Sequence, residues 1–416
     1  MLRILSVVLM VVALFFMSLD SPKVGEEERR IWTPVVLGLA ALVIMMRVPL
    51  LLRVDRRVVL SPPMIWLFAY LVWLTLSQQW SIQPAEGQNH IVMLWVVTLA
   101  SLSIADEPPS RTALVYVGVC ALVIVAGWAA FAAGWPGALS PGDVFRFKGI
   151  IRHEQTMAFC AISAFLCALV WTLNRRRVGA PAHMLPIGLT LALCLATILA
   201  TQARSFTTFF VLSLFAAWFF HLQGVRRLYV LLAALVVGGG LFLAIDVLLP
   251  LLSRGNENQD VTLSGRTIVW EATLAEIARR PWTGYGFASY QDHFSTFWNG
   301  WTPGHAHNMW LHVAFESGIV GAVLITGFVA ALLLRGLRFQ RDTGLLSHSL
   351  MLTIFLLLAD IMSVIIGGKL STPYGLLLLL AVQEERLRSL VRGARQAAEA
   401  ESPALAVNGL RIATAG

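Results

Sequence analysis

The chain has 416 residues, of which 57% are hydrophobic and only 13% are charged. Together with a positive mean hydropathy, this composition excludes an ordinary soluble globular protein and indicates one that crosses a membrane several times. The formal net charge is +8. Because the basic residues fall in short loops between apolar segments, as membrane insertion favours, nucleic acid is not an expected partner.

Apolar segments that suit a transmembrane helix recur along the whole chain. A tilted helix needs roughly 17 to 25 predominantly apolar residues to cross the hydrocarbon layer. We predict spans at residues 2–19, 34–52, 62–79, 90–105, 112–134, 155–173, 184–202, 205–222, 227–250, 318–337, 348–368 and 372–385. The sequence therefore predicts an all-α, polytopic membrane helix bundle of about twelve spans, with the lipid bilayer as a partner.

The loops between these segments sort by charge. Arginines are concentrated in every second connection, at residues 53–57, 175–177, 226–227, 335–341 and 386–395, and such loops remain on the cytoplasmic side. With an even number of spans, both termini are cytoplasmic and the connection after the ninth span is extracytoplasmic. We divide the chain into nine transmembrane helices (1–250), a periplasmic catalytic loop (251–317), three further transmembrane helices (318–390) and a disordered cytoplasmic tail (391–416).

A few ionisable residues lie inside the apolar segments. Arg47 is near a cytoplasmic end, where its side chain can snorkel to the interface. Asp246 and Asp360 fall within predicted spans, and an intramembrane carboxylate is a functional candidate by default, with proton coupling as the obvious role. For Asp360 we favour pairing with an arginine or a backbone group inside the bundle.

Basic residues on the predicted outer side need a reason, because insertion disfavours them there. Arg204 occupies a turn of a few residues between two apolar segments, and a guanidinium held at the membrane face suits a bidentate contact with phosphate or carboxylate. Arg152 and His153 belong to a short basic cluster that attracts anions. Lys369 is a further outer cation.

The long outer loop contains a predicted amphipathic helix. Ser264 can cap its N-terminus, apolar residues follow at helical spacing, and Pro281 ends it. Arg266 then lies in the first turn, where its guanidinium and the free backbone N–H groups suit an anion. Gly284 and Gly286 follow in a turn that needs tight backbone geometry.

The segment HAHNMWLHVAFESG ends this loop and contains His305, His307 and His312, three of the nine histidines. Residues 307–316 are expected to form a helix at the outer surface, because 318–337 is long enough to span the membrane alone. A neutral imidazole suits a general base that takes a proton from a hydroxyl, and His307 is the candidate. His305 and His312 are expected to be structural or solvent-facing.

A bound metal is not expected at this segment. The spacing of His305 and His307 resembles that of metal ligands, but Asp292 and His293 are the only candidates for a third ligand nearby. No cofactor is predicted.

The order of these features resembles the O-antigen ligase and Wzy-type polymerase superfamily, which includes exopolysaccharide polymerases. The resemblance covers roughly residues 140–335 by motif and the whole chain by topology. In chain order it rests on Arg204 in a short outer turn, Gly265-Arg266 with Trp270, Arg280-Pro281 with Gly284 and Gly286, His307-Asn308, Glu316, Gly318 and Gly321.

The resemblance implies a metal-independent, inverting glycosyltransferase of the GT-C type on the periplasmic face of the bacterial inner membrane. Its donor would be a glycan on undecaprenyl diphosphate, and its acceptor a carbohydrate or lipid A core. By position, Arg204 and Arg266 match the family's arginines and His307 the histidine of its H-N pair. We assign the arginines to the donor diphosphate and His307 to catalysis. The accessory candidates are Arg152, His153, Asn308, Glu316 and Lys369.

One segment departs from the family pattern. The stretch GIIRHEQTMAF looks like a family segment around its histidine, but Glu154, Gln155 and Ala158 replace Lys, Asn and Gly. This departure weakens a role for His153.

Several functions stay open at this point. The same chemistry would extend a polysaccharide repeat, transfer a glycan to lipid A core, or transfer it to a protein serine. The short outer loop and the H-A-H-N form favour an O-antigen or exopolysaccharide polymerase. A transporter or flippase is the alternative of another class, less favoured because no pair of Gly/Pro-broken spans marks two halves.

Overall fold

The computed structural model describes residues 2–16, 18, 29–141, 145–177, 184–222, 226, 229, 266–295 and 302–401. Within these ranges the chain is helical apart from its connections, where an isolated bridge joins Leu139 and Phe147. The predicted all-α fold is confirmed for this part of the chain.

The described helices follow the predicted apolar segments closely. Those before residue 135 are α1 (Leu2–Phe16), α2 (Arg29–Leu51), α3 (Arg56–Val59), α4 (Pro62–Ser77), α5 (Pro84–Ser103) and α6 (Pro109–Ala132). The middle of the chain contains the short 3-10 helix η2 (Pro136–Ala138), then α7 (Glu154–Asn174), α8 (Met184–Thr201) and α9 (Arg204–His221). The last third contains α13 (Arg266–Arg279), α14 (Tyr290–His293), α15 (Met309–Thr343), α16 (His348–Ala359) and α17 (Thr372–Glu401). Proline opens α4, α5 and α6, where its missing N–H is not needed.

Several described helices have the length and composition of membrane spans. Five of them are long and apolar enough to cross a membrane, namely Trp32–Leu51 in α2, and α6, α7, α8 and α15. Helices α1, α4, α9 and α16 are apolar but shorter. The predicted span at 227–250, with Asp246, lies outside the described residues except for Tyr229. The length and apolar composition of these helices therefore indicate an integral membrane protein.

The predicted span at 348–368 is wrong in length, because α16 ends at Ala359. Asp360 ends the helix, and its buried carboxylate accepts the backbone N–H groups of Ile365 at 2.6 Å and Ile366 at 3.0 Å. The following segment, residues 360–371, is a non-helical connection. The carboxylate is thus paired with backbone groups, which agrees with the interpretation that we favoured over proton coupling.

The last helix is longer than its predicted span. Helix α17 continues from Thr372 to Glu401, so residues 391–401, which we expected in a disordered tail, are helical. This part of the sequence is rich in Ala, Glu and Arg, which are strong helix formers and need no membrane around them.

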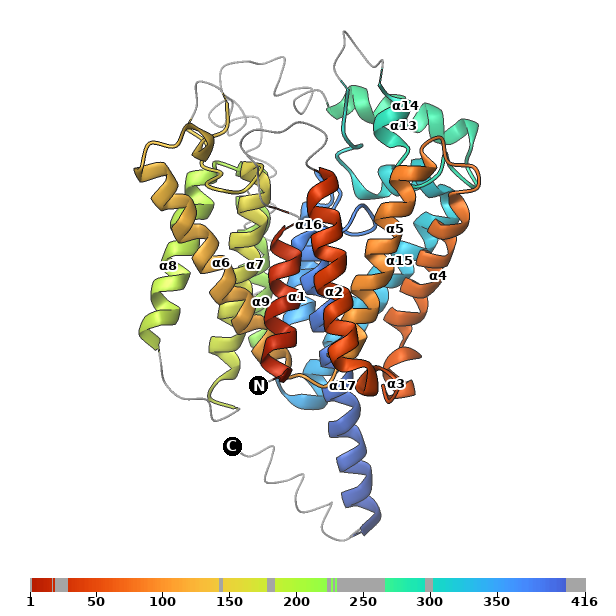
Figure 1. The fold of residues 1–416 in the computed structure, drawn as a ribbon. Coiled ribbons are helices and arrows are strands. Elements are labelled where there is room, and N and C mark those ends of the chain that lie inside the picture. Colours follow the sequence, from red (N-terminus) through yellow and green to blue (C-terminus); the bar gives the residue numbers. More distant parts are fainter. Residues whose placement is uncertain are drawn as a thin grey trace.

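The arginine-rich connections and the connections that alternate with them lie at opposite ends of the bundle. Helices α13 and α14 lie at one end, with the connection between α6 and α7, whereas α3, the start of α1 and the C-terminal part of α17 lie at the other end (Figure 1). The charge pattern therefore separated the loops in the same way as the fold does.

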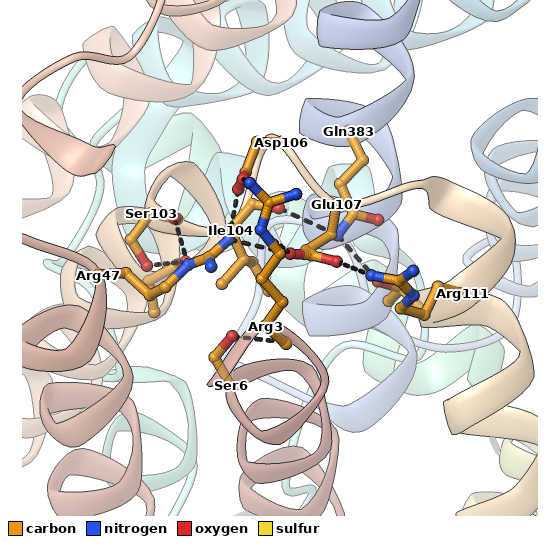
Figure 2. Close-up of polar contacts among 11 residues, drawn as sticks. Arg3, Ser6, Arg47, Ser103, Ile104, Asp106, Glu107, Arg111 and Gln383 are labelled. Atoms are coloured by element: carbon orange, nitrogen blue, oxygen red, sulfur yellow. Dashed lines mark hydrogen bonds and ion pairs between the residues drawn. The ribbon is translucent and has the colours of Figure 1, made fainter. Parts of the chain in front are cut away.

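A buried ion-pair network joins helices at the end with α3. Arg47 of α2 is only 3% exposed and pairs with Asp106 and, at 3.1 Å, with Glu107 in the connection between α5 and α6. Arg3 of α1 and Arg111 of α6 pair with the same acids (Figure 2). Arg47 therefore does not snorkel to the interface as we expected. Its desolvated charge is compensated by two carboxylates, which ties α2 to α1 and α6.

A kink in α15 receives the turn that follows α13. At Gly318 the backbone takes φ 68° and ψ −174°, which interrupts the helix. A Cβ there would lie 2.0 Å from the carbonyl oxygen of Trp282, so only glycine fits. The freed Ile319 N–H donates to the Pro281 carbonyl at 2.8 Å, and Trp73 of α4 donates to the Ser317 carbonyl at 2.8 Å.

The turn itself is built on the two glycines that the sequence singled out. Gly284 and Gly286 have φ values of 63° and 96°. A Cβ on Gly284 would lie 2.4 Å from the Phe315 carbonyl oxygen, and the Gly286 N–H donates to the Glu316 carbonyl at 2.8 Å. The turn is thereby fixed against the first part of α15, residues 309–317, which is helical as expected.

Candidate functional site

Helix α13 brings two motif residues to the histidine segment. Arg266 is its first residue, and Trp270 lies one turn later. The indole Nε1 of Trp270 donates a hydrogen bond of 2.9 Å to the carbonyl oxygen of Ala306, between His305 and His307. Val269 of α13 and Ala306 are both buried in one apolar cluster. The N-terminal end of α13 therefore lies directly against residues 305–307.

The two histidines of this segment contact each other. Their ring centroids are 4.1 Å apart, and His305 Nδ1 accepts the backbone N–H of His307 at 3.1 Å. The backbone of His307 has a φ of 52°, in the left-handed region that non-glycine residues rarely adopt. Both side chains are half-buried.

Arg266 supplies a cation within electrostatic range of both rings. Its side chain is half-buried, and Nη1 lies 3.6 Å from Met362 Sδ, in the connection between α16 and α17. Desolvation lowers the pKa of Arg266 from its ordinary value, yet a guanidinium stays protonated at neutral pH. A thioether is a weak acceptor, so most of the donor capacity of Arg266 is not used by Met362.

The surroundings keep both imidazoles neutral. Burial lowers the pKa of His307 to about 3, and the nearby charges of His305 and Arg266 act in the same direction. Burial also lowers the pKa of His305 to about 3, with smaller contributions from His312, Arg266 and His153. A neutral imidazole has a free nitrogen lone pair, so His307 is in the protonation state that a general base needs.

Asn308, the residue after His307, has a structural role at the start of α15. It caps α15, since its side-chain oxygen accepts the Leu311 N–H at 3.1 Å. Its Nδ2 donates to the Ile361 carbonyl at 3.4 Å. Asn308 therefore fixes the start of α15 against the connection that also contains Met362.

Glu316 lies about two turns further along α15. Its buried carboxylate accepts the Tyr290 N–H at 3.2 Å and lies 3.5 Å from His312 Nε2. It connects α15 to α14, below the turn that contains Gly284. His312 is likewise buried against Tyr290, with ring centroids 5.0 Å apart, so it is structural, as expected.

His153 lies at the N-terminus of α7. It is the N-cap of that helix, and its Nδ1 accepts the Gln155 N–H at 3.2 Å. Its charge contributes to the lowered pKa of His305, so the two side chains are within electrostatic range. Arg152 precedes it, is exposed, and donates its backbone N–H to the Ser18 carbonyl at 3.1 Å.

Arg204 begins a helix that packs against α16. It is the exposed first residue of α9, a helix that packs against α7 and α16. Phe206, one half-turn later, lies 4.4 Å from Phe159 of α7 between ring centroids. Joint binding of one diphosphate by Arg204 and Arg266 stays a prediction.

Lys369 pairs with an acid of another helix. Its ammonium contacts Glu86 in the first turn of α5, and His90 Nε2 lies 3.6 Å from the same carboxylate oxygen. The charge of Lys369 is thus compensated by Glu86. A role in the site stays a prediction for Lys369, as it does for Arg152.

Two contacts of the candidate residues could not be found from the sequence. Met362 contacts Arg266 across 96 positions of sequence, and Glu86 pairs with Lys369 across 283. Neither residue has a spacing or motif that points to its partner. Among the described residues, no group of three or more His, Cys, Asp or Glu side chains is arranged to hold a metal ion.

The comparisons with known proteins bear on the same part of the chain. The model of a family described as O-antigen ligase matches residues 189–326. This range contains Arg204, Arg266, Trp270, His307 and Glu316. No curated protein matches the chain. The match therefore supports the resemblance of the chain to the O-antigen ligase and Wzy-type superfamily, over a range that includes the arginine, the indole and the histidines.

Proposed function

We propose that the protein is a membrane glycosyltransferase that moves a glycan from undecaprenyl diphosphate to a hydroxyl acceptor, polymerising O-antigen or exopolysaccharide repeat units. The observation that carries the proposal is that Arg266 lies within electrostatic range of a neutral His307, with Trp270 of the same helix bonded to the peptide between the histidines. A cation beside a base suits a reaction that releases a diphosphate and takes up a proton.

The chemistry proceeds in one displacement. The acceptor hydroxyl gives its proton to His307 while its oxygen forms a bond to the anomeric carbon. The bond between that carbon and the diphosphate oxygen breaks, and the lipid diphosphate leaves with the additional negative charge. Arg266 and Arg204 stabilise this charge as it develops. Attack from the face opposite the leaving group inverts the anomeric centre.

A second candidate has the same donor and a different acceptor. The matching family model is described as an O-antigen ligase, and this favours transfer of the glycan to lipid A core. A protein serine is chemically equivalent as an acceptor. A transporter or flippase is disfavoured because α13, which begins with Arg266, lies at one end of the bundle (Figure 1), whereas transporters bind substrate near the bilayer midplane.

The proposal includes an orientation in the membrane. We place the protein in the bacterial inner membrane as a GT-C type bundle of about twelve spans, with both termini in the cytoplasm and α13 on the periplasmic side. Single cysteines at Thr302 and at Ala397 test this placement in spheroplasts. We expect an impermeant maleimide to label the first position and not the second.

The decisive experiment supplies purified protein in lipid nanodiscs with undecaprenyl diphosphate glycan and three acceptors in parallel: a second repeat unit, lipid A core and a serine peptide. Wild type is compared with His307→Ala and Arg266→Ala. Arg279→Ala is the matched control, since Arg279 ends the same helix and its side chain is 72% exposed. We expect loss of transfer in the first two variants only. Full transfer by both would refute the assignment, and the acceptor that is used separates polymerase from ligase.

A metal requirement is tested in the same assay. Because the proposed charge stabilisation comes from guanidinium groups, transfer should continue after exhaustive chelation and dialysis. Loss of transfer on chelation, restored by a divalent cation, would contradict this part of the proposal.

A further inference from the structure

His305 makes a local hydrogen bond that determines the backbone of its neighbour. Its Nδ1 accepts the N–H of His307, two residues later, at 3.1 Å. This is the arrangement in which Asn and Asp side chains accept from the residue two positions on and stabilise a turn. The backbone that follows is the left-handed one at His307, with φ 52°, and it needs such support because a non-glycine residue disfavours it.

The bond also assigns the protonation of the His305 ring. A nitrogen that accepts a hydrogen bond carries no proton, so in the neutral ring the proton is on Nε2. Taking up a second proton would require Nδ1 and would break the bond to His307. His305 is therefore poorly suited to accept the proton of the reaction, and its ring serves as an acceptor for the backbone.

The segment around His307 is fixed from three sides. Trp270 of α13 bonds the carbonyl of Ala306 at 2.9 Å, and Asn308 caps α15 immediately afterwards. Between these two anchors, the orientation of the His307 backbone depends on the bond from His305. Replacing the His305 ring with a shorter side chain would leave both anchors intact. It would remove the hydrogen bond that supports the backbone conformation of His307.

We propose that His305 is a positioning residue for His307, because its Nδ1 holds the His307 backbone in the conformation that presents the imidazole to the acceptor hydroxyl. This inference rests on the proposed function, in which His307 is the base. A displacement of about 1 Å in a catalytic group lowers the rate by about 100-fold, so the effect should appear in kcat and leave the KM for the lipid-linked donor unchanged.

The test uses three substitutions at one position. Asparagine places its side-chain oxygen where Nδ1 lies and keeps the acceptor. Alanine removes the acceptor, and glutamine moves it one bond further from the backbone. We expect His305→Ala and His305→Gln to lower kcat by about 100-fold, with the donor KM within about twofold, and His305→Asn to stay within about fivefold of wild type.

A double-mutant cycle separates this role from an independent one. If His305 acts through His307, adding His305→Ala to His307→Ala should reduce the residual rate no further. Full activity of His305→Ala, or an Asn variant as slow as the Ala variant, would overturn the proposal. If the Ala variant unfolds, the contrast between Asn and Gln decides. Failure of the proposed function itself would appear separately, as full activity of His307→Ala.

Discussion

The indole of Trp270 is bonded to the carbonyl oxygen of Ala306, across 36 positions of sequence. This bond joins α13, which contains Arg266, to the segment that contains His307. It explains why a tryptophan one turn after the arginine belongs to the same motif. The indole positions the proposed base relative to the proposed anion site.

Removal of that bond should reduce activity more than stability. Trp270→Phe keeps most of the apolar ring and loses the N–H donor. A single hydrogen bond stabilises a protein by about 1 kcal/mol, so the melting temperature should change little. We expect kcat to fall by roughly tenfold or more, because residues 305–307 lose their anchor on α13. Trp282→Phe is the control, since Trp282 is 68% exposed. Equal activity of the two variants would contradict the anchoring role.

The pH dependence of transfer should reflect buried, neutral histidines. Burial lowers the pKa of His307 to about 3, so the base is already free at pH 5, and kcat/KM should stay flat between about pH 5 and 8. A decrease is expected only as the pH approaches about 4. A half-maximal loss near pH 6.5, where an exposed histidine titrates, would show that His307 is not buried in the free enzyme.

The same pKa shifts affect folding stability. The unfolded chain binds protons on His305 and His307 near pH 6.5, whereas the folded chain binds them only near pH 3. Between these values the unfolded state holds more protons, so the free energy of unfolding decreases as the pH falls from about 6.5. Denaturant titrations at pH 7 and pH 5 should show this decrease in wild type and a smaller one in His305→Asn. An equal decrease in both would be evidence against burial of His305.

Gly318 should be intolerant of any side chain. A Cβ at this position would lie 2.0 Å from the carbonyl oxygen of Trp282, and φ is 68°. Gly318→Ala must therefore separate the turn after α13 from the kink in α15, at a cost of about 2 kcal/mol or more. Thermal unfolding in detergent measures the effect. Gly118→Ala is the control, since nothing lies within 4 Å of its added Cβ. A melting temperature for Gly318→Ala equal to that of the control would refute the account of the kink.

The ion-pair network of Arg47, at the end of the bundle opposite α13, should contribute strongly to folding stability. Arg47→Met leaves the fully buried carboxylate of Glu107 without its main buried partner (Figure 2). Loss of one member of a buried pair costs about 3–5 kcal/mol. Arg3→Met is the matched control, because Arg3 is 63% exposed and lies 3.9 Å from the same acid. Thermal unfolding should separate the variants clearly. Transfer by the folded fraction should be unchanged, because the network lies away from α13.

Some features of this protein follow from local sequence alone. The apolar segments predict the helices because each helix pairs its own backbone groups and needs only a run of apolar residues to enter a bilayer. The arginine-rich loops at residues 53–57 and 335–341 predicted which connections share one end of the bundle, because positively charged loops stay on one side of the membrane. Gly284 and Gly286 were recognisable as special positions, although their partners were not, and the kink at Gly318 was not predicted.

Other features depend on contacts between distant parts of the chain. The end of α16 was missed because Asp360 looks like one polar residue in an apolar run, and only its bonds to Ile365 and Ile366 stop the helix. Arg47 was misplaced because its two acids come 59 and 60 residues later. The sequence named Arg266 and His307 separately. Only the tertiary structure placed the N-terminal end of α13 against residues 305–307, because the bond from Trp270 to Ala306 and the packing of α13 on α15 arise when the chain is folded.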